Sequence, residues 1–202
     1  MIDYISIFIF FFAVVDPIGT IPIFIAVTAN HGARSKKMIA AISTLAATGV
    51  LLFFIIAGEF ILNAMNIPLS AFQTAGGIIL FLFALTMIFG DGKPAEEIKL
   101  VNNVNETAIF PLAIPSIASP GAMLAAVLLT ENAQFNFIQQ VQITSVLLVV
   151  LLITFFLMLL ASQIHRFIGN SGASIISRVM GLILASVATA NTLEGIKGYF
   201  SL

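Results

Sequence analysis

A single carboxylate, Asp16, lies near the centre of an apolar stretch that runs over residues 4–29. Pro17 and Gly19 follow it closely. An ionised group in the middle of a bilayer is costly, and such groups mark the paths of ions, protons or solutes. Proline and glycine interrupt a helix, which is tolerated at membrane depth only where the freed backbone groups face protein or water. The pattern therefore predicts a broken membrane helix that carries a binding site.

A second break is predicted in the apolar stretch 108–130, where Pro120 and Gly121 follow Ser119. Asp16 and Ser119 suit the N-cap position of the helix segment after each break. The N–H groups there suit an anion, and the carbonyl groups before each break suit a cation or an ammonium group. One carboxylate between two such breaks can hold a zwitterion; alternatively, Asp16 binds a coupling proton or a sodium ion. The predicted substrate-binding residues are Asp16, Pro17, Gly19, Thr20, Ser119, Pro120 and Gly121.

A purely structural interpretation of the same residues is also open. Proline and glycine are frequent in membrane helices and bend many of them without binding anything. Asp16 can likewise be a helix cap that is buried in protein and contacts no solute. Two breaks, each in the middle of a span, favour the functional interpretation.

The composition requires a membrane around these breaks. The chain has 202 residues, of which 60% are hydrophobic and 8% are charged, whereas soluble domains carry roughly 25% charged residues. A spanning helix needs about 20 mostly apolar residues. The sequence therefore predicts an all-α integral membrane protein with six transmembrane helices, over residues 4–29, 39–58, 67–90, 108–130, 141–163 and 174–193.

The two halves of the chain resemble each other. Asp16-Pro17 and Ser119-Pro120 lie 103 residues apart, and Gly77 and Gly181 lie in similar segments 104 residues apart. Each half has three spans, an odd number, so the halves enter the membrane in opposite directions, as in many secondary transporters. We expect a first repeat over 1–90, a cytoplasmic connector over 91–107 and a second repeat over 108–202, with helices one and four discontinuous. Small residues allow close helix contact, and the glycines expected to pack near the site are Gly76, Gly77 and Gly181.

The remaining polar residues carry weaker signals. Glu59 and Glu194 end spans two and six, where a solvated position is favoured and a part in transport stays open. Gln73 and Asn191 lie within spans, where polar residues either line a path or form hydrogen bonds between helices, and a packing role is favoured for both. The chain has no cysteine, no metalloprotease motif, no nucleophile elbow and no Walker-type phosphate loop. We therefore expect no catalytic residue, no metal site and no cofactor, and we do not expect an enzyme.

Several segments resemble those of the MarC family, which includes the SnatA-type small neutral amino acid transporters. The matching segments are DPIGTIPIF at 16–24, FQTAGGIILFLFALTMIFG at 72–90, AIFPLAIPSIASPGAM at 108–123 and SRVMGLILASVATANTLEGI at 177–196. The resemblance implies a secondary transporter that moves glycine, alanine or serine across the inner membrane by alternating access, driven by a proton or sodium gradient. Its partners would be a small-molecule substrate and membrane lipid, and no nucleic acid. The alternatives are an exporter of another small metabolite or drug, and a non-transporting membrane scaffold or accessory subunit.

The basic residues predict how the chain lies in the membrane. Loops between spans one and two, three and four, and five and six share one side, which carries seven of the eight basic residues when the foot of span six is included. Cytoplasmic loops are rich in lysine and arginine. These seven residues are Arg34, Lys36, Lys37, Lys93, Lys99, Arg166 and Arg178, against Lys197 on the other side.

Both termini are therefore expected outside the cytoplasm. A reporter that is active only in the cytoplasm should be inactive when fused to Leu202 and active when inserted in the 91–107 connector. The opposite result in the same membrane preparation would reverse the predicted orientation.

Overall fold

Every described element of the protein is a helix. The computed structural model describes residues 3–89, 103–132 and 135–200. Within these ranges five helical segments are long and apolar enough to cross a membrane, or six if the bent pair Val104–Ile117 and Pro120–Leu128 is one span. The all-α prediction with several spans is confirmed. In chain order the elements are α1 (Tyr4–Val15), α2 (Thr20–Val27), α3 (Ala33–Ala64), α4 (Leu69–Phe89), α5 (Val104–Thr107), the irregular helical segment η2 (Ala108–Ile117), α6 (Pro120–Leu128), α7 (Phe137–Leu159) and α8 (Ala161–Phe200).

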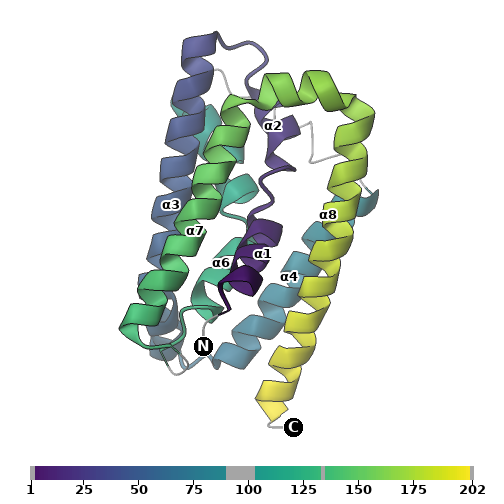
Figure 1. Cartoon of the computed structure of the whole chain (residues 1–202). Coiled ribbons are helices and arrows are strands. Elements are labelled where there is room, and N and C mark those ends of the chain that lie inside the picture. Colours follow the sequence, from purple (N-terminus) through teal and green to yellow (C-terminus); the bar gives the residue numbers. More distant parts are fainter. Residues whose placement is uncertain (1–2, 90–102, 133–134, 201–202) are drawn as a thin grey trace.

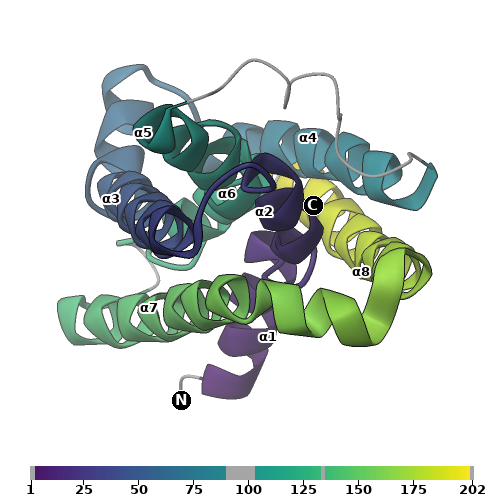
Figure 2. The same ribbon diagram turned by 90° about the horizontal axis from the view of Figure 1, so that it is seen from above.

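The first span lies in the middle of the bundle. Seen from above, α2 lies between α3, α7, α8, α4 and α6, whereas α1 crosses behind α7 and its N-terminal end emerges outside this ring (Figure 2). In the most apolar stretch of this span, 67% of the residues are buried inside the protein, against 28–33% in the corresponding stretches of the other four spans. The surrounding helices expose large apolar side chains such as Ile56 and Phe60. Exposed apolar surface of this extent indicates contact with lipid. The neighbouring helices therefore separate the break at Asp16 from the lipid.

The helix ends follow local capping signals. Asp3 accepts hydrogen bonds from the backbone N–H groups of Ile5 and Ser6 and caps α1. The Ser6 hydroxyl also donates to the Asp3 carboxylate at 2.6 Å and lowers the pKa of that group. Asn136 and Gln139 form a reciprocal capping box at the start of α7. These caps place helix starts where apolar content alone gives no signal.

Two helices extend beyond the apolar stretches. α3 covers Ala33–Ala64 rather than 39–58, because the polar residues that flank its apolar part also have good helix propensity. α8 covers Ala161–Phe200 and bends at Gly169, whose φ of +66° favours glycine. The bend at Gly169 therefore lies between the predicted spans 141–163 and 174–193, and the first part of α8 lies across one end of the bundle (Figure 1).

The predicted connector 91–107 is only partly described. Residues 91–102 lie outside the described residues. Asn103 accepts a hydrogen bond from the backbone N–H of Asn105 and caps α5, so the last residues of the predicted connector are helical.

Helices α4 and α8 lie side by side along one edge of the bundle (Figure 1). A Cβ atom on Gly77 would meet the Thr192 hydroxyl and would lie 2.9 Å from the Ala188 carbonyl oxygen. A Cβ atom on Gly181 would lie 3.1 Å from the Ala84 carbonyl oxygen. The glycines thus let the two backbones approach closely, as small residues do in membrane helix pairs.

Replacing Gly77 with alanine should therefore weaken the α4–α8 contact. We expect Gly77→Ala to lower the melting temperature of the detergent-purified protein. Gly49→Ala is the matched control, because a Cβ atom at Gly49 has no neighbour within 4 Å and alanine has the higher helix propensity. Equal effects of the two substitutions would contradict this role of Gly77.

Candidate functional site

The break after α1 is built around the Asp16 carboxyl group. Asp16 has a φ of +49° and a ψ of +66°, a left-handed conformation that aspartate tolerates better than most residues. Its backbone N–H donates to the Phe12 carbonyl, and its Oδ1 accepts from the Gly19 N–H at 2.9 Å. Its side chain is buried, with 1% of its surface exposed. An ionisable group therefore sits between two helix ends in the centre of the bundle.

Asp16 is not the N-cap of the second helix segment. That prediction is wrong, because Pro17, Ile18 and Gly19 form a turn and α2 begins only at Thr20. Asp16 instead ends α1 and binds the N–H three residues further on, as aspartate side chains do in turns. The carboxylate still binds a backbone N–H of the break, but from the preceding helix.

The break before α6 follows the predicted pattern more closely. Ser119 is the N-cap of α6, its side chain accepts from the Ala122 N–H at 3.1 Å, and Pro120 occupies the first turn. The preceding segment η2 contains extended residues at Phe110 and Ile114, each directly before a proline. Proline disfavours helical conformation in the residue before it, so η2 cannot be regular. The segments before and after Ser119 differ in direction by 58°.

Two side-chain contacts join the breaks. The Ser119 hydroxyl donates to the Val14 carbonyl oxygen at 2.8 Å, although the two residues lie 105 positions apart. The Thr20 and Ser116 hydroxyl oxygens lie 3.3 Å apart, and the Thr20 hydroxyl also lies 3.0 Å from the Asp16 carbonyl oxygen. All of these side chains are buried. The structure thus brings Asp16, Thr20 and Ser119 into one buried polar cluster.

Ser116 belongs to this cluster although it is absent from the set predicted from the sequence. Its only signal is a hydroxyl three residues before Ser119 in an apolar segment. Serine is common in membrane helices and often bonds within its own helix. The contact with Thr20 depends on how two distant segments pack, which spacing alone does not give.

The glycines of the predicted site have different surroundings. A Cβ atom on Gly19 would collide with the Asp16 carboxyl group, with 2.6 Å to its carbon. A Cβ atom on Gly121 would meet the Leu80 side chain of α4, and one on Gly76 would lie 2.7 Å from the Leu124 side chain of α6. Gly19 therefore makes room for the carboxylate, whereas Gly76 and Gly121 let α4 and α6 pack together. Gly77 and Gly181 lie between α4 and α8 rather than against either break.

Glu59, a weaker candidate, has a structural role. Its Oε2 accepts from the Asn132 backbone N–H at 2.9 Å and from the Asn132 side-chain amide at 2.8 Å. It thus joins α3 to the segment after α6. These bonds account for its position without a bound solute.

Comparison with known proteins assigns the family. The profile described as "MarC family integral membrane protein" matches residues 1–200.

The chain belongs to the MarC family.

The resemblance to this family noted in the sequence is confirmed, and the chain is a multi-pass integral membrane protein. It is 33% identical over 190 residues to a UPF0056 membrane protein of Methanocaldococcus jannaschii, covering 93% of this chain and 92% of the relative. It is 34% identical over 203 residues to the UPF0056 inner membrane protein YhgN of Escherichia coli (strain K12), covering 98% of each. No solved structure matches the chain.

The bond between Ser119 and Val14 should stabilise this MarC-family protein. Ser119→Ala removes both that bond, worth roughly 0.5–1.5 kcal/mol, and the cap of α6, worth roughly 0.5–2 kcal/mol. We expect a lower melting temperature in detergent. Ser145→Ala is the control, because the exposed Ser145 hydroxyl bonds only within α7; a Ser119→Ala protein as stable as this control would contradict the assignment.

Proposed function

We propose that this protein is a secondary transporter of small neutral amino acids, and that it binds its substrate where the two helix breaks meet. The observation that carries the proposal is the Asp16 carboxylate, which is 1% exposed and lies in a polar cluster inside an apolar bundle. A buried ionisable group at membrane depth is costly and is retained where it binds or moves something.

The breaks supply complementary partners for a zwitterion. An ammonium group would bind the Asp16 carboxylate and the carbonyl groups at the end of α1. A carboxylate would be attracted to the start of α6, where the helix dipole is positive and Ser119 already accepts from the Ala122 N–H. Helix ends of this kind hold anionic substrate groups in other secondary transporters.

The close packing around the breaks favours a small substrate. The Asp16 carboxyl group already occupies the space where a Gly19 side chain would lie, and the Leu80 side chain occupies the same space at Gly121. Little room remains for a long side chain, which favours glycine, alanine and serine. A proton or a sodium ion on Asp16 would couple transport to an ion gradient. This function corresponds to the SnatA-type members of the family and includes no catalytic step and no cofactor.

Reciprocal contacts support an inverted repeat. The backbone of Gly77 packs against the Ala188 carbonyl, and that of Gly181 packs against the Ala84 carbonyl. Gly77 and Gly181 differ by 104 positions, and so do Ala84 and Ala188. Such exchange of equivalent contacts is typical of a two-fold axis. We therefore infer two inverted three-helix repeats, over 1–90 and 108–202, with helices one and four discontinuous at Asp16 and Ser119.

This architecture suits alternating access. Two repeats of opposite orientation can move against each other and expose a central site first to one side and then to the other. Together with the basic loops, this architecture supports a connector in the cytoplasm and both termini outside. The proposed location is the inner membrane, the location named for the Escherichia coli relative.

The test is uptake of labelled glycine, alanine and serine into proteoliposomes under an imposed proton or sodium gradient. Unlabelled glycine, alanine and serine should compete, and lysine and glutamate should not. Absence of uptake under either gradient would contradict transport of these solutes, and equal competition by lysine or glutamate would contradict the small neutral substrate.

Asp16→Asn should reduce uptake at least tenfold and abolish its dependence on the gradient. Gly19→Ala should have a similar effect, because its Cβ atom would displace the Asp16 carboxyl group. Glu106→Gln is the control, since Glu106 is exposed in α5. Wild-type uptake by Asp16→Asn would remove the central role of this residue.

A further inference from the structure

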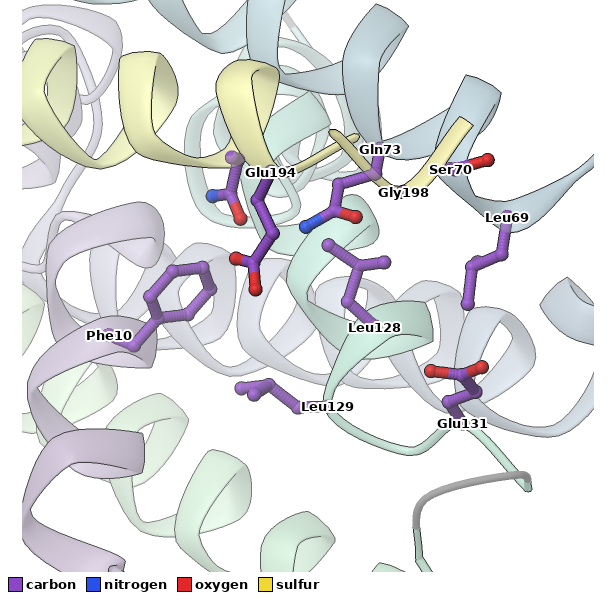
Figure 3. Close-up of a pocket in the computed structure, with 10 residues that line it drawn as sticks. Phe10, Leu69, Ser70, Gln73, Leu128, Leu129, Glu131, Glu194 and Gly198 are labelled. Atoms are coloured by element: carbon purple, nitrogen blue, oxygen red, sulfur yellow. The ribbon is translucent and has the colours of Figure 1, made fainter. Parts of the chain in front are cut away.

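A polar cavity lies at the end of the bundle that carries both termini. Its volume is about 450 Å³. It is bounded by α1, α4, α8 and the end of α6 with the segment that follows (Figure 3). The lining residues that matter for its chemistry are Phe10, Gln73, Leu129, Glu131, Asn191 and Glu194.

The cavity has a carboxylate directed into it. In Figure 3 the Glu194 carboxylate points from α8 into the space between Phe10 and Leu129, and the Gln73 amide points into the same space from α4. Glu131 lies on the other side of the cavity. These groups offer oxygen acceptors to a positively charged ligand. Glu194 is exposed, as expected of a solvated position, and it also lines this cavity.

Asn191 supplies the opposite chemistry. Its side chain is 8% exposed and lines the cavity. Among the described residues its Nδ2 group has no hydrogen-bond partner, so the helix-to-helix bond expected of this residue is not formed by that group. Buried polar groups in folded proteins are nearly always paired. A buried N–H donor without an acceptor in a cavity wall indicates that a ligand or water oxygen binds there.

Asn191 and Glu194 lie on one face of α8, because residues three positions apart on a helix are neighbours. The wall of the cavity therefore presents an amide donor beside a carboxylate. A molecule that carries both a carboxylate and an ammonium group matches this pair. A metal ion matches less well, since no group of three or more histidine, aspartate or glutamate side chains in the described part of the chain is placed to hold one.

We propose that this cavity is an outer subsite for a small zwitterion, with the ammonium group on Glu194 and the carboxylate on Asn191. The inference rests on the proposed transport function, which it deepens by adding a binding step before the Asp16 site. Phe10, in the cavity wall, precedes Asp16 by six residues, or about 9 Å along a helix. The two sites thus follow each other along α1.

The absence of cysteine from the chain permits a direct test. Ser70 lines the cavity, so Ser70→Cys provides a thiol there for a membrane-impermeant reagent added from outside. Saturating glycine should slow its labelling at least fivefold, and methylamine or acetate should have much less effect. Ser6→Cys is the control, because Ser6 is exposed near the N-terminus and is not part of the lining; glycine should not change its labelling.

Two further substitutions separate the roles of the pair. In the Ser70→Cys protein, Glu194→Gln should raise the glycine concentration needed for protection at least fivefold, whereas Glu106→Gln should not. Asn191→Leu should abolish the advantage of glycine over methylamine. Three outcomes would each overturn the proposal. Glycine could fail to protect Ser70→Cys, or methylamine could protect it as well as glycine does when Asn191 and Glu194 are intact. Glycine could also protect Ser70→Cys fully when Glu194→Gln is present.

The two proposals can fail separately. Glycine should still protect Ser70→Cys when Asp16→Asn is present, although uptake is lost, because the outer subsite does not include Asp16. Protection without any uptake by the wild-type protein would refute transport and leave the binding site intact. Asp16-dependent uptake without protection would refute the outer subsite alone.

Discussion

The hydrogen bond from the Ser119 hydroxyl to the Val14 carbonyl is the contact on which the arrangement of the two breaks depends. Val14 lies in the last turn of α1, where carbonyl groups have no N–H partner within the helix. At membrane depth no bulk water can replace that partner. A hydroxyl from the second break satisfies this carbonyl, and the same oxygen caps α6 by accepting from Ala122. One serine thereby serves two helix ends and fixes the breaks against each other.

The same constraint explains why the first span lies in the centre. A helix that is interrupted at Asp16 exposes backbone groups and a carboxylate, so lipid contact there would be costly. The span is therefore wrapped by its neighbours, while α3, α4, α7 and α8 keep most of their apolar surface for lipid. The burial of α1 and α2 is in this sense a consequence of Asp16, Pro17 and Gly19.

The local parts of this arrangement could be predicted from the sequence, and the tertiary parts could not. Apolar length gives the all-helical class, and the proline residues after Asp16 and Ser119 mark where helices stop, because both signals act on neighbouring residues. The start of α2 at Thr20 depends on how far the turn extends, and the bend at Gly169 depends on which of several polar and glycine residues adopts a positive φ. The Thr20–Ser116 contact and the packing of Gly121 against Leu80 join distant segments, so no local pattern indicates them.

The close packing of α4 and α8 also bears on the outer cavity. Gln73 reaches it from α4, and Asn191 and Glu194 reach it from α8. Gly77 packs against Ala188, and a Cβ atom on Gly195 would lie 2.8 Å from the Ser70 carbonyl oxygen, so glycines hold these helices together at the level of the cavity. In an inverted repeat, α4 and α8 are equivalent elements of opposite halves. Any movement of one half against the other must therefore pass through this glycine contact and change the distance between Gln73 and Glu194. The cavity thus lies where a relative motion of the proposed repeats would alter its shape, which would connect the proposed binding in this cavity to the state of the central breaks.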